Sequence, residues 1–187
     1  IGNFQSTDEL IFEEKSDAFT VGITLSSDEK YYFISTSDHN TSEQYFFKVD
    51  EKKPQPKLIK KRKKGILYSV SSWDNKFYNH TNEGAEDFKI EISESLENQK
   101  WKSFIKPKNE VLIGSCIFLK NWIIRSETSN ALDRLFVRHI SKESEEELNI
   151  SDEKVCVPNI SLRQKDRDTD EVYIGYSSPK TPSRVYL

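Results

Sequence analysis

The hydrophobic and polar positions of this chain alternate with a period of two residues through short runs that end in turn-forming residues. Between Phe19 and Thr24, apolar side chains at positions 19, 21 and 23 alternate with threonine and glycine. This period is typical of a β-strand with one buried and one exposed face. Clusters of Ser, Asp, Asn and Pro separate the runs, as expected for turns between neighbouring strands. The pattern therefore predicts an all-β protein.

Two series of aromatic or apolar positions recur along the chain in step with each other. The first series consists of Tyr31, Phe77, Trp122 and Tyr173, and the second of Tyr45, Phe88, Leu135 and Val185. Within each series, neighbouring members are 43 to 51 residues apart, a period that four-stranded propeller blades produce. The repeat therefore predicts a β-propeller arrangement.

The strand-and-turn pattern divides the chain into predicted units. We expect about three complete four-stranded blades, over residues 18–61, 65–107 and 110–150, with an incomplete blade over residues 154–187. Residues 1–15, with the apolar run Leu10-Ile11-Phe12, are expected to hold the outer strand of a preceding blade. Natural propellers close with about four to eight blades. The sequence therefore predicts part of a larger propeller whose uncovered edges favour self-association, with an open assembly that is stable by itself as the alternative.

Composition and charge indicate a soluble, globular protein. Hydrophobic residues make up 35% of the 187 residues and charged residues 32%, and the net charge is −3, which gives no global reason to expect nucleic acid as a partner. No apolar run approaches the length of a membrane span, and no signal peptide opens the chain. The sequence contains no methionine, so we expect a processed N-terminus or a piece of a longer protein, with removal of the initiator as the alternative.

The only two cysteines, Cys116 and Cys156, each lie in an apolar run. Small secreted domains usually carry more cysteine. We therefore favour two buried thiols in a reducing cytosol, and hence a cytoplasmic protein, over a disulfide between them.

A basic run, residues 57–64, contains five lysines and one arginine. Such a run can bind phosphate groups, but no aromatic residues interleave it, as they do in many nucleic-acid-binding surfaces. Lysines on an outermost strand also protect its edge from pairing with another chain. We favour this structural interpretation over binding of DNA or RNA.

An acidic run between Glu143 and Glu153 lacks the spacing of a calcium-binding loop. We expect this run to be a solvated loop between blades, and we expect a weak outer strand of the third blade near Leu148.

No catalytic machinery is visible in these residues. The three histidines, His39, His80 and His139, lie far apart and have no partner at metal-ligand spacing. The serines include no Gly-x-Ser-x-Gly elbow, and six glycines form no phosphate-binding loop. Proximity in sequence does not make catalytic carboxylates of Glu13, Glu14 and Asp17. We therefore assign no catalytic, cofactor-binding or metal-binding residue and expect no cofactor.

Three stretches resemble the N-terminal β-propeller of the oligopeptidase B (protease II) branch of the prolyl oligopeptidase family, the S9 serine peptidases. Residues 10–21 are similar to that group's apolar strand, paired acids, Asp and aromatic residue. Residues 41–50 resemble its Thr-Ser-Glu-Val and Leu-Asp segment, and residues 175–182 resemble its Tyr-Ser-Ser-x-x-Thr-Pro motif. Because the blades between them fall at matching spacings, the resemblance spans essentially the whole chain.

This resemblance implies a partial propeller of the seven-bladed type, without the α/β-hydrolase domain that carries the family's Ser-Asp-His triad. None of the triad residues has a counterpart here. In the family, the propeller caps the active site and restricts substrates to short peptides, which oligopeptidase B cuts after Arg or Lys. The chain is therefore expected to be a non-catalytic, substrate-gating partner of a hydrolase domain, with a stand-alone β-rich peptide- or protein-binding module as the alternative.

Overall fold

Short strands joined by turns and loops build most of the described part of the chain, and they pair with antiparallel neighbours close in sequence. The computed structural model describes residues 8–142, 144–150, 152–153, 155–162 and 169–187. Its strands form four separate antiparallel sheets that follow one another in chain order. The all-β prediction is confirmed.

The four sheets are called blades 1 to 4, and the first two contain four strands each. Blade 1 consists of β1 (Thr20–Leu25), β2 (Tyr31–Ser37), β3 (Ser42–Lys48) and β4 (Lys57–Lys60). Blade 2 consists of β5 (Tyr68–Trp73), β6 (Lys76–Thr81), β7 (Lys89–Ser93) and β8 (Lys102–Ile105).

The other two sheets contain four and three strands. Blade 3 consists of β9 (Leu112–Phe118), β10 (Trp122–Ser129), β11 (Leu132–His139) and β12 (Glu145–Glu147). Blade 4 has three strands in the described residues, namely β13 (Val157–Leu162), β14 (Val172–Ser177) and β15 (Arg184–Tyr186). Three four-stranded sheets and one shorter sheet agree with the predicted partial propeller.

The residues before β1 do not form the strand predicted at Leu10–Phe12. Residues 8–18 have no strand assignment, and residues 1–7 lie outside the described ranges. Side-chain contacts hold the segment against blade 1 instead: the Phe12 ring lies 4.7 Å from the Tyr45 ring, and Glu14 accepts a hydrogen bond from Arg62. Of the apolar run, Phe12 therefore packs through its side chain, while Leu10 and Ile11 are exposed.

The sequence repeat corresponds to equivalent strands. The members of the first series all lie in the second strand of a blade, namely Tyr31, Phe77, Trp122 and Tyr173. Three members of the second series lie in the third strand of a blade, namely Tyr45, Leu135 and Val185. The fourth member of the second series, Phe88, directly precedes β7 with a φ of 68°. The period therefore reports the strand order within each blade.

Blades pack face to face through two aromatic-rich clusters. The cluster between blades 1 and 2 contains Phe33, Phe46, Ile59, Tyr68, Val70, Phe77 and Leu96. The cluster between blades 2 and 3 contains Trp73, Tyr78, Ile90, Ile105, Ile113, Phe118 and Ile123. Large rings bury much apolar surface per residue, so a chain with 12% aromatic residues can join three sheets this way.

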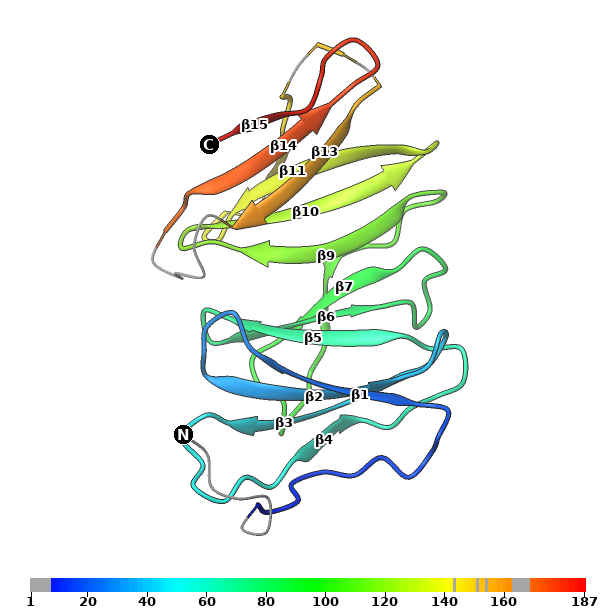
Figure 1. Ribbon diagram of the computed structural model, residues 1–187, viewed down its shortest axis with the longest axis vertical. Helices are drawn as coiled ribbons and strands as arrows, with labels where there is room; N and C mark the ends of the chain where they lie inside the picture. Colours follow the sequence, from blue (N-terminus) through cyan, green and yellow to red (C-terminus); the bar gives the residue numbers. More distant parts are fainter. Residues whose placement is uncertain (1–7, 143, 151, 154, 163–168) are drawn as a thin grey trace.

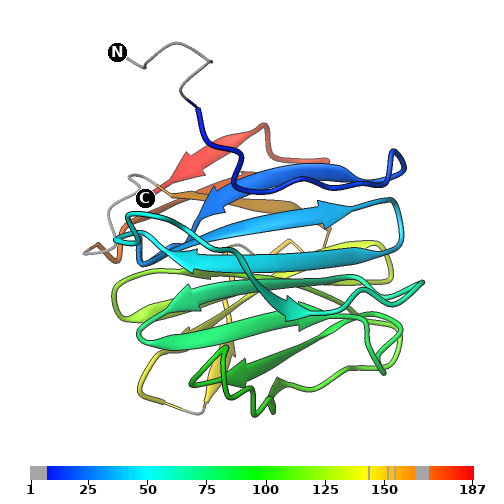
Figure 2. The same cartoon turned by 90° about the horizontal axis from the view of Figure 1, so that it is seen from below.

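The sheets form an open stack rather than a ring. Figure 1 shows blade 1 at one end of the stack and blade 4 at the other, and Figure 2 shows blade 1 in front when the stack is viewed from that end. All six residues of β1 are exposed, with Val21 at 52% and Ile23 at 59%. At the far end Val157 and Val185 are 57% and 68% exposed. Each terminal blade therefore presents uncovered apolar side chains.

The described residues contain no helix with the length and apolar character needed to cross a bilayer.

Candidate functional site

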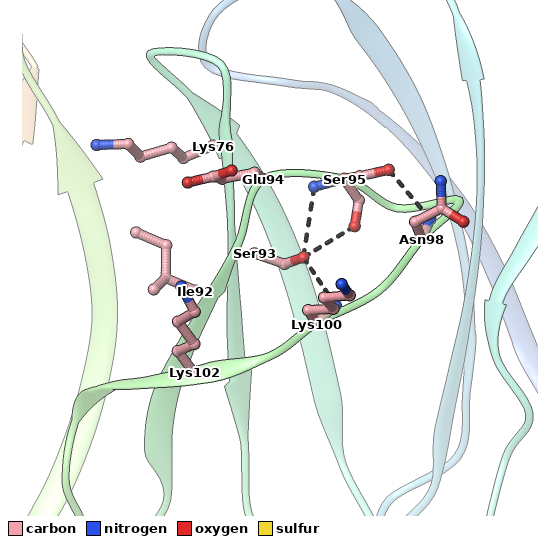
Figure 3. A pocket seen from close by; sticks show the side chains of 8 residues that line it. All are labelled: Lys76, Ile92, Ser93, Glu94, Ser95, Asn98, Lys100 and Lys102. Atoms are coloured by element: carbon pink, nitrogen blue, oxygen red, sulfur yellow. Dashed lines mark hydrogen bonds between the residues drawn. The ribbon is translucent and has the colours of Figure 1, made fainter.

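A hollow of about 450 Å³ lies at the edge of blade 2, where the chain leaves β7 and returns into β8. Figure 3 shows the side chains that surround it. They are Lys76, Ile92, Ser93, Glu94, Ser95, Asn98, Lys100 and Lys102. The volume is within the range of small-molecule sites in proteins.

The loop between β7 and β8 is held in shape by two serine hydroxyls. Ser93 Oγ donates to the carbonyl oxygen of Ser95 at 2.9 Å and accepts the backbone N–H of Lys100 at 3.3 Å. Ser95 Oγ accepts the N–H groups of Glu97 and Asn98 at 3.2 and 3.1 Å. Such side-chain-to-backbone bonds replace a ladder in tight turns.

The same loop is anchored to blade 1 by its central residues. Leu96 is buried in the cluster between blades 1 and 2. Gln99 Nε2 donates to the backbone carbonyl oxygens of Ile59 at 2.6 Å and Leu96 at 3.0 Å. The loop that carries Lys100 is therefore fixed from both sides, so the hollow does not depend on an unsupported segment.

The chemistry of the hollow is that of an anion site and not of a reaction centre. Among the described residues, its lining contains three ammonium groups and one carboxylate, and neither histidine nor cysteine. Nucleophilic catalysis needs a nucleophile within reach of a base. The Ser93 hydroxyl, the most buried of the lining, already bonds to the loop backbone. The hollow can therefore bind charge, and its buried hydroxyl is already engaged by the loop.

Two further hollows lie between blades 3 and 4. One, of about 510 Å³, is lined by residues 132–135 of β11, residues 147–150, and Asp152, Glu153, Cys156 and Pro158. The other, of about 360 Å³, lies between β9–β11 and the Pro158–Ile160 part of β13. The interface between these blades is therefore less completely filled than the two aromatic clusters.

Part of the acidic run forms the weak outer strand predicted near Leu148 and is not a solvated loop. Its residues Glu145–Glu147 form β12, the outer strand of blade 3, while Glu143 lies outside the described residues. The Arg125 side chain, which is 1% exposed, donates to both carboxylate oxygens of Glu145 and also to Glu127. A buried guanidinium must be paired, and this requirement draws Glu145 onto the sheet.

The electrostatics of this ionic cluster follow from burial and pairing. Burial by itself lowers the pKa of Arg125, but the hydrogen bonds to Glu145 and Glu127 outweigh it and hold the pKa above its ordinary value. Lys108, which follows β8, also binds Glu127, and its ammonium lies 4.9 Å from the Phe136 ring centroid. The cluster thus ties the end of blade 2 to blade 3.

The basic run begins on β4, the edge strand of blade 1, as the structural interpretation predicted. Its charges are also largely paired. Lys57 Nζ lies 3.2 Å from Glu97, Lys60 binds Glu83, and Arg62 binds both Glu14 and Glu43. The hydrogen bond from Arg62 lowers the pKa of Glu14. These pairs connect the edge of blade 1 with blade 2 and with the N-terminal segment.

The three histidines do not meet. His80 Nε2 lies 2.7 Å from the backbone carbonyl oxygen of Ile113, and its ring stacks on Phe88 at 4.5 Å. Burial lowers the pKa of His80. His139 instead packs beside Trp122 at 5.0 Å, in blade 3. Across the described ranges, no three His, Cys, Asp or Glu side chains gather closely enough to hold a metal ion.

Both cysteines are free thiols in this structure, so the disulfide alternative is wrong. Cys116 lies on β9, and burial raises its pKa to about 12. Cys156 precedes β13 and lines the larger hollow beside blade 4.

Two hydroxyls of the Tyr-Ser-Ser-x-x-Thr-Pro motif bind the carboxylate of Glu153, a contact that the sequence did not predict. Glu153 accepts hydrogen bonds from the hydroxyls of Ser178 at 2.5 Å and Thr181 at 2.6 Å, and these bonds lower its pKa. The partner precedes the motif by a whole strand pair, so no local pattern could have identified it. Residues 166–170 form a charged stretch of the sequence, and only Thr169 and Asp170 of it lie in the described residues. Asp170 accepts two hydrogen bonds of 2.7 Å from Asn121.

Comparison with known proteins identifies the family. The family "Prolyl oligopeptidase, N-terminal beta-propeller domain" matches residues 1–187. Protease 2 of Moraxella lacunata is 28% identical over 186 residues, and dipeptidyl aminopeptidase BI of Pseudoxanthomonas mexicana is 25% identical over 189 residues. Both alignments cover 100% of this chain but 26% of the relative, so the chain spans about a quarter of each relative's length.

Solved structures show the same fold. Oligopeptidase B from Trypanosoma brucei, with covalently bound antipain, superposes with a TM-score of 0.89 at 23% identity and covers 100% of this chain and 28% of its own. Oligopeptidase B from Leishmania major gives a TM-score of 0.86 at 18% identity, covering 99% of this chain and 28% of its own. Together with the match over all of its residues, this places the chain in the prolyl oligopeptidase family, as a portion of the N-terminal β-propeller domain.

Proposed function

We propose that this chain is the part of a propeller that caps the active site of a serine oligopeptidase, whose substrates are short peptides cut after Arg or Lys. The observation that carries the proposal is the family match over all 187 residues. The catalytic partner is an α/β-hydrolase domain of the same parent protein, and the chain by itself is non-catalytic.

The uncovered ends of the stack support a place inside a larger propeller. Val21 and Ile23 on β1, and Val157 and Val185 on blade 4, are all more than half exposed. Apolar surface of this kind normally packs against a neighbouring sheet. Further blades at both ends would bury these side chains in the way that the aromatic clusters bury the inner faces.

The proposed cap has a simple physical role. A propeller over a hydrolase active site limits access by size, so that short peptides enter and folded proteins do not. It also excludes water from the reacting groups. The paired charges on the edges of blades 1 and 2 suit this passive role, because they stiffen the wall without supplying reactive groups.

We further propose a cytoplasmic location. Its support is that Cys116 and Cys156 are both free, as expected in a reducing compartment.

The proposal is tested with the parent reading frame. Its product is purified and assayed on short Arg- or Lys-containing peptides and on a folded protein that contains the same sites. We expect turnover of the peptides alone, and none by residues 1–187 in isolation. Turnover that stays with residues 1–187 through repurification contradicts the proposal. A parent without a hydrolase domain contradicts it too, and favours the stand-alone binding module.

A further inference from the structure

We propose that the hollow at the β7–β8 loop of blade 2 is a binding site for a small organic anion, a carboxylate or a phosphate ester. Three lysines reach it from two places in the blade: Lys76 begins β6, and Lys100 and Lys102 lie in and after the β7–β8 loop. Figure 3 shows Lys76 beside Glu94, with Lys100 and Lys102 further along the loop.

The charge in the hollow is not neutralised by the protein. Lys76, Lys100 and Lys102 make no ion pair anywhere in the described ranges, and Glu94 is the single acid in the lining. The neighbouring lysines differ: Lys57 and Lys60 bind Glu97 and Glu83 across the blade boundary. The lining therefore carries an excess positive charge that its surroundings leave for a ligand.

The backbone positions that carry the lysines are set before any ligand binds, because Lys76 and Lys102 begin strands β6 and β8. Ser93 and Ser95 hold the backbone of the loop, and Leu96 and Gln99 fix it to blade 1. A preorganised site loses less conformational entropy on binding than a mobile one. A concave surface lined by like charges also focuses its potential on the space inside.

The lining also suggests what accompanies the anionic group. Ile92 contributes an apolar wall, and the aliphatic stems of lysines cover apolar surface while their ammonium groups meet the charge. A volume of about 450 Å³ exceeds what a bare phosphate or carboxylate group needs. An anion attached to a short apolar or aromatic body therefore fits better than an inorganic ion.

The test uses the purified chain and three probes: benzoate, phenyl phosphate and inorganic phosphate, each at constant ionic strength set with sodium chloride. Thermal unfolding reports stabilisation by ligand, and ¹H–¹⁵N NMR shifts locate it. The variant K76Q/K100Q/K102Q removes the three charges. The matched control K15Q/K64Q/K106Q removes three exposed lysines that also lack ion pairs in the described ranges.

We expect benzoate or phenyl phosphate to raise the unfolding temperature, with NMR shifts confined to residues 92–102 and the start of β6. Which of the two binds more tightly distinguishes a carboxylate site from a phosphate-ester site. Affinity should fall at least tenfold in K76Q/K100Q/K102Q, by less than twofold in the control, and steeply with salt. Without ligand, the triple variant should unfold no earlier than the wild type, because it relieves repulsion between like charges.

Three results overturn the proposal. The first is an equal loss of affinity in the control variant, which indicates non-specific attraction. The second is a set of NMR shifts that spread over the whole surface, or the absence of NMR shifts with all three probes. The third is a triple variant that is markedly less stable without ligand, since the lysines then serve the fold.

Discussion

The contacts among blades 1, 2 and 3 differ from those between blades 3 and 4. The first two interfaces are filled by rings: Tyr31 lies 5.3 Å from Phe77 across one of them, and Tyr78 lies 4.8 Å from Phe118 across the other. The third interface has Leu135 on β11 and Pro158 on β13 beside two hollows of about 510 and 360 Å³. One architectural repeat therefore gives interfaces that differ in how they are filled.

The difference shows that strand order and packing are separate properties. Blade 4 repeats the antiparallel hairpins of the other blades, yet small and polar residues line its contact with blade 3, including Ser126, Thr128 and Asn159. Dispersion and apolar burial depend on close contact. We therefore regard blades 1 to 3 as the stable body of the structure and blade 4 as its weakest-held sheet.

The largest effect should come from removing a ring in the body. Phe77 is buried between blades 1 and 2, so Phe77→Ala should lower the free energy of unfolding by about 3–5 kcal/mol. Ile160→Ala, beside the hollow next to blade 4, should cost about 1 kcal/mol, because part of its surroundings is already empty. Urea unfolding measures both. Equal costs would remove the distinction between the interfaces.

A second effect tests whether ionic contacts strengthen the body as well. Arg125→Ala leaves Glu145 without its cation and Glu127 with Lys108 alone, and should cost about 3 kcal/mol. The control Arg134→Ala breaks an exposed pair with Glu147 at 3.6 Å and should cost below about 1 kcal/mol. Thermal unfolding of the two variants checks the order. If Arg125→Ala lowers the stability no more than Arg134→Ala does, the ionic cluster does not contribute to stability.

A smaller effect concerns pH at the interface of blades 2 and 3. Burial lowers the pKa of His80 below its ordinary value, so the folded state favours the neutral ring. The stability from this group is complete above the unfolded pKa of about 6.5. It is lost as pH falls towards the folded pKa, by at most about 1.4 kcal/mol per pH unit. Urea unfolding between pH 5 and 8 should show this slope in the wild type and not in His80→Gln.

The smallest expected effect concerns how fast the two thiols, one at each kind of interface, react with a thiol reagent. Cys116 packs against the cluster between blades 2 and 3, and burial raises its pKa to about 12, so it should react with a thiol reagent only after unfolding. Cys156 borders the hollow beside blade 4 and should react in the native state. Labelling followed by peptide mass mapping measures both rates, with Cys156→Ser as control. Faster reaction of Cys116 would reverse the proposed order of strength.

The repeat in the sequence identified strands but could not assign their faces. Tyr31 and Phe77 are matching members of the first series, yet Tyr31 points from blade 1 towards blade 2, whereas Phe77 points from blade 2 back towards blade 1. An offset of one residue in a strand exchanges its two faces. The residue after Phe77, Tyr78, is the one that faces blade 3. Because the separations within each series vary by several residues, the repeat cannot reveal an offset of one residue.

Local sequence by itself determined the all-β class, the hairpins and the succession of sheets, because alternation of apolar residues and turn chemistry act between neighbours in the chain. Tertiary structure alone decided the partners of the charged residues. Arg125 finds Glu145 from another strand, Glu153 holds the distant hydroxyls of Ser178 and Thr181, and three lysines gather around one hollow. Such sites depend on which sheet faces bring remote residues within a few ångströms, and that distance is a property of the packed fold.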